Sequence, residues 1–529
     1  MRITYNDKLN KLLNPYLESL LKEKSSLEPE TLTLFDLFME DLDMGGRYGI
    51  FSEILEPRLE EIIREENIES IANLMDGRLN TLFRYMLGDE FAGLFHTYLQ
   101  LEARCPHTIG YDRRAQRSAN PSNHLDHARD AWLQFLKLRA TGFSVEAILK
   151  GGNTPEDTEE FSGYMNSSYW LAAQIAQGNE KVIEYLNQVL TSENNVHRLQ
   201  RWYLHAIAIS GYRPLLELEG KLLLAAKLQE GLRQAIVETM DEGCPESYLY
   251  LFSIIYNNGL QRFASVKRSI AVCTGIGEQD SSERITNKYV ELIWNFLNHP
   301  ETARNALQSK DTVELYLALW SIGFYDTDEI RAIVPDIIRK GAKHQIQTLL
   351  YFLRCTQSSQ MNHLISKDAF EVWHDDPKVV AAILPLYMDG LYLSRYSDNK
   401  EAPTLSDYFE SPEEAVRHYG YLKQVYQSIS AKEIYSPYVF PWDCVVLTRS
   451  DVVHKMAYIA WMTNDIRLRE ELCTYLPALE SYSRASYIGI VLAHTESKVE
   501  QEYVLQSLGD RSSDIRDEAY KVLSEMSLS

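Results

Sequence analysis

The chain has 529 residues, with 53 Lys and Arg against 75 Asp and Glu, a formal net charge of −22 and 45% hydrophobic residues. Such a composition supports a buried core, and the low counts of proline (17) and glycine (25) favour long helices over a β-sandwich or a loop-rich scaffold. The acidic balance argues against general binding to nucleic acid or to an anionic membrane, because both require clustered lysine and arginine.

The targeting signals of a secreted or membrane protein are missing from the sequence. The N-terminal segment has polar residues where a signal peptide carries its apolar run, and no stretch approaches the ~20 apolar residues of a transmembrane helix. The six cysteines are widely spaced and form no CxxC pair, which is typical of reduced, buried thiols. We therefore expect a cytoplasmic protein with no membrane partner.

Residues 1–102 are predicted to form an irregular N-terminal helical region, and residues 103–125 a polar loop rich in arginine. A cluster of arginines can hold a phosphate or carboxylate through bidentate hydrogen bonds. The same side chains can instead pair with the surplus of acidic residues, and this alternative stays open. The tentative binding residues of the loop are Arg104, Arg113, Arg114 and Arg117.

The same loop contains one set of potential zinc ligands, Cys105, His107, His124 and His127. Their pair spacings could close a tetrahedral site. The Cys-x-His pair and the long separation do not match a common zinc module, however, so we expect ordinary polar side chains and no bound metal.

Residues 126–390 are predicted to form a solenoid of helical hairpins. Apolar positions with the i, i+3, i+4, i+7 spacing of a helix begin at Val313, Ile346 and Val379, at intervals of 33 residues. Another apolar stripe, beginning at Ile330, lies between the first two, so each period holds two helices. Asp376-Pro377 and Ser411-Pro412 have the N-cap and N1 residues typical of helix starts.

Residues 391–445 are interpreted as an insertion that carries an aromatic segment. Its four large side chains are separated by Pro437 and Pro441, so they cannot continue a helix. They either fold back onto the solenoid, which is the favoured interpretation, or present a docking surface. The four aromatic residues are Tyr435, Tyr438, Phe440 and Trp442.

Residues 446–529 are predicted to continue the hairpins, with apolar stripes that begin at Val453, Ala485 and Ala519. The segment from Leu508 to Leu523 resembles a HEAT repeat, in which a turn Asp and a helical Arg precede an Ala and a closing Leu. The resemblance implies an α-solenoid that binds other proteins.

A second resemblance depends on Pro441-Trp442-Asp443 and the following segment, Leu447 to Val453. They look like the N-terminal helical region of large bacterial proteins of unknown function related to the molybdate metabolism regulators. This resemblance implies that the chain is the front part of a longer protein.

Catalytic motifs are absent from the sequence. There is no P-loop and no GxSxG elbow, and Glu371-x-x-His374 stands alone where a di-iron bundle needs two such pairs. His374-Asp375 lies just before a predicted helix start, so we interpret it as part of a cap and not as a metal-binding pair. We therefore expect an all-α, HEAT- or armadillo-like solenoid without cofactor or catalytic residues.

Its expected function is to bind a protein partner or another domain of a longer polypeptide. The first alternative is a ligand-dependent regulator or enzyme that uses the arginine-rich loop between Arg104 and Arg117. The second alternative is a HEAT-like DNA-repair enzyme, which the acidic composition disfavours because such enzymes need a basic concave face.

Overall fold

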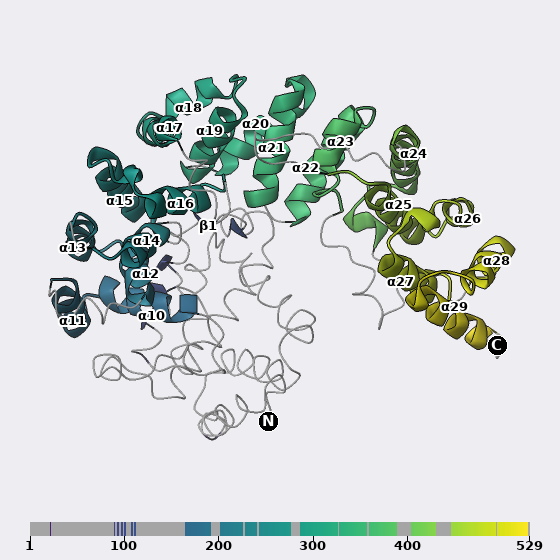
Figure 1. Cartoon of the computed structure of the whole chain (residues 1–529), viewed down its shortest axis with the longest axis horizontal. Helices are drawn as coiled ribbons and strands as arrows, with labels where there is room; N and C mark the ends of the chain where they lie inside the picture. Colours follow the sequence, from purple (N-terminus) through teal and green to yellow (C-terminus); the bar gives the residue numbers. More distant parts are fainter. Residues whose placement is uncertain are drawn as a thin grey trace. The chain divides into compact units, whose positions relative to one another are not determined.

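The computed structural model describes residues 164–191, 201–225, 228–240, 243–276, 286–325, 327–356, 359–388, 404–429, 446–493 and 495–526, with scattered residues between 22 and 112. This part of the chain is all-α (Figure 1). The exception is a two-residue antiparallel pair inside the predicted polar loop, where β1 (His107–Thr108) pairs with β2 (Tyr111–Asp112). The chain divides into two compact units, residues 1–300 and 301–529.

In the first unit, helices that are two apart in the chain pack against each other. One row consists of α10, α12, α14 and α16, and the other of α11, α13, α15 and α17. The bounds are α10 (Tyr164–Ala176), α11 (Glu180–Thr191), α12 (Arg201–Ser210), α13 (Arg213–Leu223), α14 (Glu230–Glu238), α15 (Pro245–Asn257), η5 (Leu260–Arg262), α16 (Ala264–Cys273) and α17 (Asn287–Asn298).

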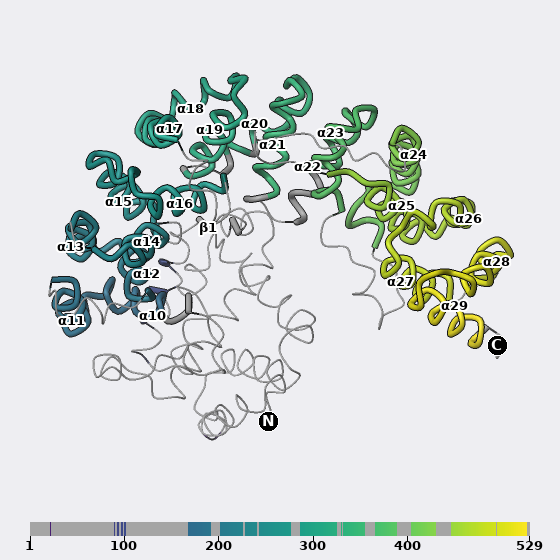
Figure 2. Tube along the Cα trace, viewed as in Figure 1, coloured from purple at the N-terminus to yellow at the C-terminus, as the bar shows by residue number. Residues whose placement is uncertain are grey.

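The second unit has the same alternation. Helix α19 contacts α21, which contacts α23, while α20 contacts α22; further along, α25 contacts α27, which contacts α29, while α26 contacts α28. The Cα trace crosses between the two rows at each turn from α25 to α29 (Figure 2). The bounds are α18 (Pro300–Ala306), α19 (Thr312–Tyr325), α20 (Thr327–Lys340), α21 (Lys343–Thr356), α22 (Ser359–Trp373), α23 (Pro377–Ile383), η7 (Leu405–Asp407), α24 (Pro412–Ser428), α25 (Arg449–Thr463), α26 (Ile466–Leu472), η8 (Leu476–Ala478), α27 (Ser481–Val491), α28 (Lys498–Ser507) and α29 (Ser513–Met526).

Each apolar stripe that the sequence analysis identifies in the C-terminal half lies within a helix or runs into the turn just after it. The stripe that begins at Val313 lies in α19, the one at Ile346 in α21 and the one at Val379 in α23, and all three residues are buried. The stripe of α20 is turned slightly from its predicted position. Its buried residues are Ile330, Val334 and Ile338, spaced by four, and the predicted Ile333 and Ile337 are half-buried.

The helix starts explain why these segments begin where they do. The carboxylate of Asp376 accepts from the backbone N–H groups of Lys378 and Val379 at the start of α23. The Ser411 hydroxyl accepts from the N–H of Glu414 at the start of α24. These contacts satisfy N–H groups that have no partner inside the helix, and they confirm two predicted caps.

Candidate binding cleft and the polar networks around it

A cleft of about 390 Å³ opens between α20 and α22. Its walls are mainly apolar, and one wall residue, Val372, is 47% exposed although it is a large aliphatic side chain. Pro335 interrupts the hydrogen bonding of α20 at this point, because proline has no N–H to donate. The apolar lining residues are Val334, Pro335, Ile338, Ile365 and Val372, and the charged ones are Arg339, Asp368 and Glu371. We call this the α20–α22 cleft.

Two of the charged groups in the α20–α22 cleft are unpaired. Neither Asp368 nor Arg339 forms a hydrogen bond or an ion pair in the described part of the chain. Loss of solvent around the carboxyl raises the pKa of Asp368, although the nearby charges of Lys367 and Arg339 act in the opposite direction. An unpaired, partly desolvated carboxylate is a favourable contact point for a cation supplied from outside.

Glu371 belongs both to the cleft and to a hydrogen-bond network behind it. Its Oε1 accepts from Arg417 Nη2 at 2.6 Å and from His418 Nε2 at 2.9 Å, and its Oε2 accepts from the Tyr421 hydroxyl at 3.2 Å. Partial burial raises the pKa of Glu371, but the hydrogen bonds from Arg417 and His418 outweigh burial and hold the pKa below its ordinary value. The network therefore joins α22 to α24 through an ionised carboxylate.

The ring of His418 is fully buried between two partners. Burial lowers the pKa of His418 and outweighs the opposite effect of the Glu371 carboxylate, so the ring is neutral. Because a carboxylate can only accept, Nε2 carries the hydrogen that is donated to Glu371. Nδ1 then accepts from the Tyr387 hydroxyl at 2.8 Å. These two contacts hold the orientation of the ring, and with this set of donors the hydrogen lies on Nε2.

A second carboxylate, Glu414, completes this group. Its Oε1 lies 3.1 Å from Lys367 Nζ, and its Oε2 accepts from the backbone N–H of Glu410 at 2.6 Å. One ligand atom each from Glu371, Glu414 and His418 lies within 4.8 Å of the other two. The two carboxylates are balanced by two cations, Lys367 and Arg417, around a neutral imidazole.

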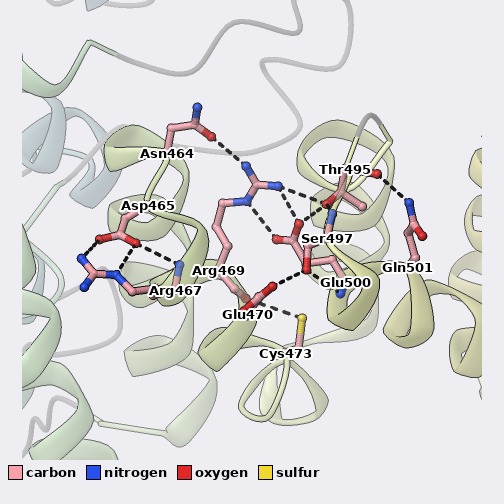
Figure 3. Close-up of polar contacts among 10 residues, drawn as sticks. All are labelled: Asn464, Asp465, Arg467, Arg469, Glu470, Cys473, Thr495, Ser497, Glu500 and Gln501. Carbon is pink, nitrogen blue, oxygen red and sulfur yellow. Dashed lines mark hydrogen bonds and ion pairs between the residues drawn. The ribbon is translucent and has the colours of Figure 1, made fainter.

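A different polar network links α26 to α28 (Figure 3). Arg469 donates from Nε and Nη2 to the two oxygens of Glu500 at 2.9 and 2.6 Å, and from Nη1 to Asn464 at 2.7 Å. Thr495 also donates to Glu500, whose side chain is 0% exposed. The Glu500 carboxylate is sealed from solvent and paired with Arg469, so this network connects two helices and leaves no carboxylate oxygen open to a ligand.

None of the binding residues expected from the sequence lies among the described residues. This holds for the arginines between Arg104 and Arg117 and for the aromatic residues between Tyr435 and Trp442, so both sets stay predictions. Of the four potential zinc ligands, only the backbone of His107 is described, in β1. The expectation of buried thiols is confirmed for Cys244, Cys273 and Cys473, which are free and buried.

The sequence places His374 three residues after Glu371, but the side chain of Glu371 hydrogen-bonds to His418 instead. The ring of His374 stacks on Tyr421 with 3.8 Å between the ring centroids. Its Nδ1 lies 3.2 Å from the backbone oxygen of Glu371. Glu371 and His418 lie 47 positions apart, and no local spacing marks such a pair. The helix start at Ser411-Pro412 was predicted from the sequence, but the contact of Glu414, in the first turn of this helix, with Lys367 was not.

The described helices include none that is both long enough and apolar enough to span a bilayer. Comparison with curated proteins finds no match, and comparison with solved structures finds none either. One family model, described as a family of unknown function (DUF5724), matches residues 34–529. The chain therefore belongs to the DUF5724 family of unknown function.

Proposed function

We propose that this protein is a non-catalytic α-solenoid scaffold of HEAT-like hairpins, and that it holds a polypeptide partner through the α20–α22 cleft. The alternating contacts between helices two apart support the solenoid, because stacked hairpins bury their apolar stripes against their neighbours in this way. The cleft supports the binding role, since it combines apolar walls with an unpaired charge of each sign.

Polar links between successive hairpins add support to the stacking. Lys343 at the start of α21 contacts Asp376 at the start of α23 at 2.7 Å. Near the C-terminus, Arg484 of α27 contacts Asp510, the turn residue before α29, at 2.6 Å. Asp510 belongs to the segment that resembles a HEAT repeat, and Arg516 of the same segment donates to the Asp510 backbone oxygen. Comparable turn positions are thus linked to the preceding hairpin.

The unpaired Asp368 is the observation that carries the proposed partner chemistry. An amphipathic helix can bind in a groove between two helices by inserting an apolar side chain into it. Charged residues that flank this side chain then contact the charged residues at the edge of the groove. The cleft volume of about 390 Å³ suits one or two such side chains. A lysine or arginine of the partner would pair with Asp368, and an acidic residue would meet Arg339. We therefore expect a helical segment with an apolar anchor next to a basic residue.

Fluorescence anisotropy with synthetic peptides tests this proposal. The probe is a labelled amphipathic helix made of leucine and lysine, and the two comparison peptides replace lysine by glutamate or leucine by serine. We expect saturable binding of the first peptide only. Val372→Asp should weaken it by about tenfold or more, because a desolvated anchor site at the centre of an interface is sensitive to a charge.

The net charge of −22 requires a control for nonspecific attraction of a basic peptide. Asp336→Asn removes one exposed carboxylate from the same helix as the cleft, but Asp336 does not line it. Asp368→Asn should weaken peptide binding several-fold, and Asp336→Asn should leave it unchanged. Equal effects of the two substitutions, or equal binding of the serine-containing peptide, would overturn the proposal.

A further inference from the structure

We propose that Glu371, Glu414 and His418 form a binding site for a divalent transition-metal ion, with Zn²⁺ the best-matched ion. This inference is independent of partner binding and concerns the group behind the cleft. The three side chains come from α22 and α24, and their ligand atoms lie within 4.8 Å of one another. One imidazole and two carboxylates are a ligand set that Zn²⁺ accepts, and three protein ligands leave a fourth position for water.

The surroundings of His418 are those of a metal-binding histidine. Such a residue usually fixes its ring through a hydrogen bond from the nitrogen that does not bind the metal. Tyr387 occupies this position, 2.8 Å from Nδ1. A phenol hydroxyl both donates and accepts, so the ring can move its hydrogen from Nε2 to Nδ1. Nε2 then faces Glu371, at 2.9 Å, with a free lone pair.

Lys367 pairs with Glu414 and Arg417 pairs with Glu371, so these two cations provide the positive charge that an ion would bring. Arg417 is 48% exposed, so its guanidinium can turn to solvent when an ion takes its place. Lys367 is only 9% exposed, but a long aliphatic stem allows its ammonium group to move while the stem stays packed. The two cations therefore compete with the ion, and removing one should tighten metal binding.

An ion can reach this group through the α20–α22 cleft. Glu371 lines the cleft with its side chain 30% exposed, whereas His418 is sealed on the inner side. An ion held by Glu371 and His418 would therefore keep its open position toward the cleft. This arrangement differs from the Arg469–Glu500 network, where the carboxylate is wholly buried.

Titration of the 529-residue chain with Zn²⁺, and with Co²⁺ as a spectroscopic substitute, tests the site. The bound stoichiometry is measured by calorimetry for the wild type, for Glu414→Gln and for Glu413→Gln. Glu413 is the exposed neighbour of Glu414 on the same helix and serves as a matched control. We expect Glu414→Gln to lose one ion per chain and the visible Co²⁺ absorption of a four-coordinate site. Glu413→Gln should keep both.

Lys367→Met separates a metal site from a plain ion-pair network. If Lys367 competes with the ion, its removal should tighten Zn²⁺ binding by about tenfold, and Zn²⁺ should raise the melting temperature of this variant more than that of the wild type. The proposal is overturned if Glu414→Gln binds as many ions as the wild type. It is also overturned if Lys367→Met gains neither affinity nor a larger thermal shift.

Discussion

Glu500 and Glu371 each accept hydrogen bonds from an arginine, but they differ in their access to solvent. Glu500 is 0% exposed and its partner Arg469 is 15% exposed, whereas Glu371 is 30% exposed and Arg417 is 48% exposed. The first pair lies entirely between α26 and α28. The second pair lies at the edge of a cleft that also holds unpaired charges. Similar ion pairs therefore connect helices in one place and border the proposed binding cleft in another.

Breaking the sealed pair should produce the largest effect on stability. Arg469→Met leaves the buried Glu500 carboxylate without a cation, which should destabilise this region by about 3–5 kcal/mol. Hydrogen exchange of peptides from α26 and α28 measures the loss locally, without assuming that both units unfold together.

The double variant Arg469→Met/Glu500→Met distinguishes an uncompensated charge from lost packing. Replacing both members of a buried pair by apolar side chains of similar size is often neutral or stabilising. Protection in α28 should therefore return in the double variant. Equal loss of protection in the single and double variants would mean that the charge pair itself holds the helices together.

Glu219 extends the comparison, because it is a buried carboxylate that forms no ion pair among the described residues. Glu219 in α13 is 0% exposed, and neither of its oxygens has a hydrogen-bond partner among the residues that the structure describes. Burial raises the pKa of Glu219 well above its ordinary value. Glu219→Met should therefore stabilise the unit containing residues 1–300 by about 1–3 kcal/mol at neutral pH, because it removes an unsatisfied polar group.

The pH dependence of this effect has a definite sign. Between the unfolded pKa, about 4.5 for glutamate, and the raised pKa of the folded state, the folded chain binds the proton that the unfolded chain has lost. Stability therefore falls as pH rises through this window, and the advantage of Glu219→Met should grow over the same range. Urea unfolding at several pH values measures it. The exposed Glu217→Met is the control, and a pH-independent difference for Glu219→Met would contradict the account.

The smallest effect on stability is expected at the cleft itself. Asp368 has no described partner to lose, so Asp368→Asn should change the free energy of unfolding by less than about 0.5 kcal/mol. The melting temperatures of Asp368→Asn and Arg469→Met, each measured against the wild type, compare the two effects directly. A loss as large as that of Arg469→Met would mean that Asp368 supports the fold and is not kept for a ligand.

The helices were predictable because their signals are local. Apolar stripes such as the one at Ile346 and caps such as Asp376-Pro377 lie within one or two turns, where side-chain spacing and backbone hydrogen bonds are determined by neighbouring residues. The turned face of α20 was missed because the placement of Ile338 depends on which side of the helix α22 covers.

The candidate site was not predictable for the opposite reason. Glu371 contacts His418 across 47 positions, and Arg339 and Asp368 share a cleft only because α20 packs on α22. Ligand motifs that can be recognised in a sequence, such as Glu371-x-x-His374, have their residues close together in the chain. In a fold made of stacked helices, side chains that meet are commonly about one hairpin apart.

Methyl NMR of the 529-residue chain tests the central claim most directly, namely that the cleft between α20 and α22 binds a helical segment of a partner. The leucine–lysine peptide is titrated into protein labelled at isoleucine and valine methyl groups. The account predicts that the methyl signals of Val334, Ile338, Ile365 and Val372 shift with one common saturation curve, while those of Val453 and Ile488 in α25 and α27 stay in place. Unchanged signals at the cleft, or shifts of equal size in α25 and α27, would contradict it.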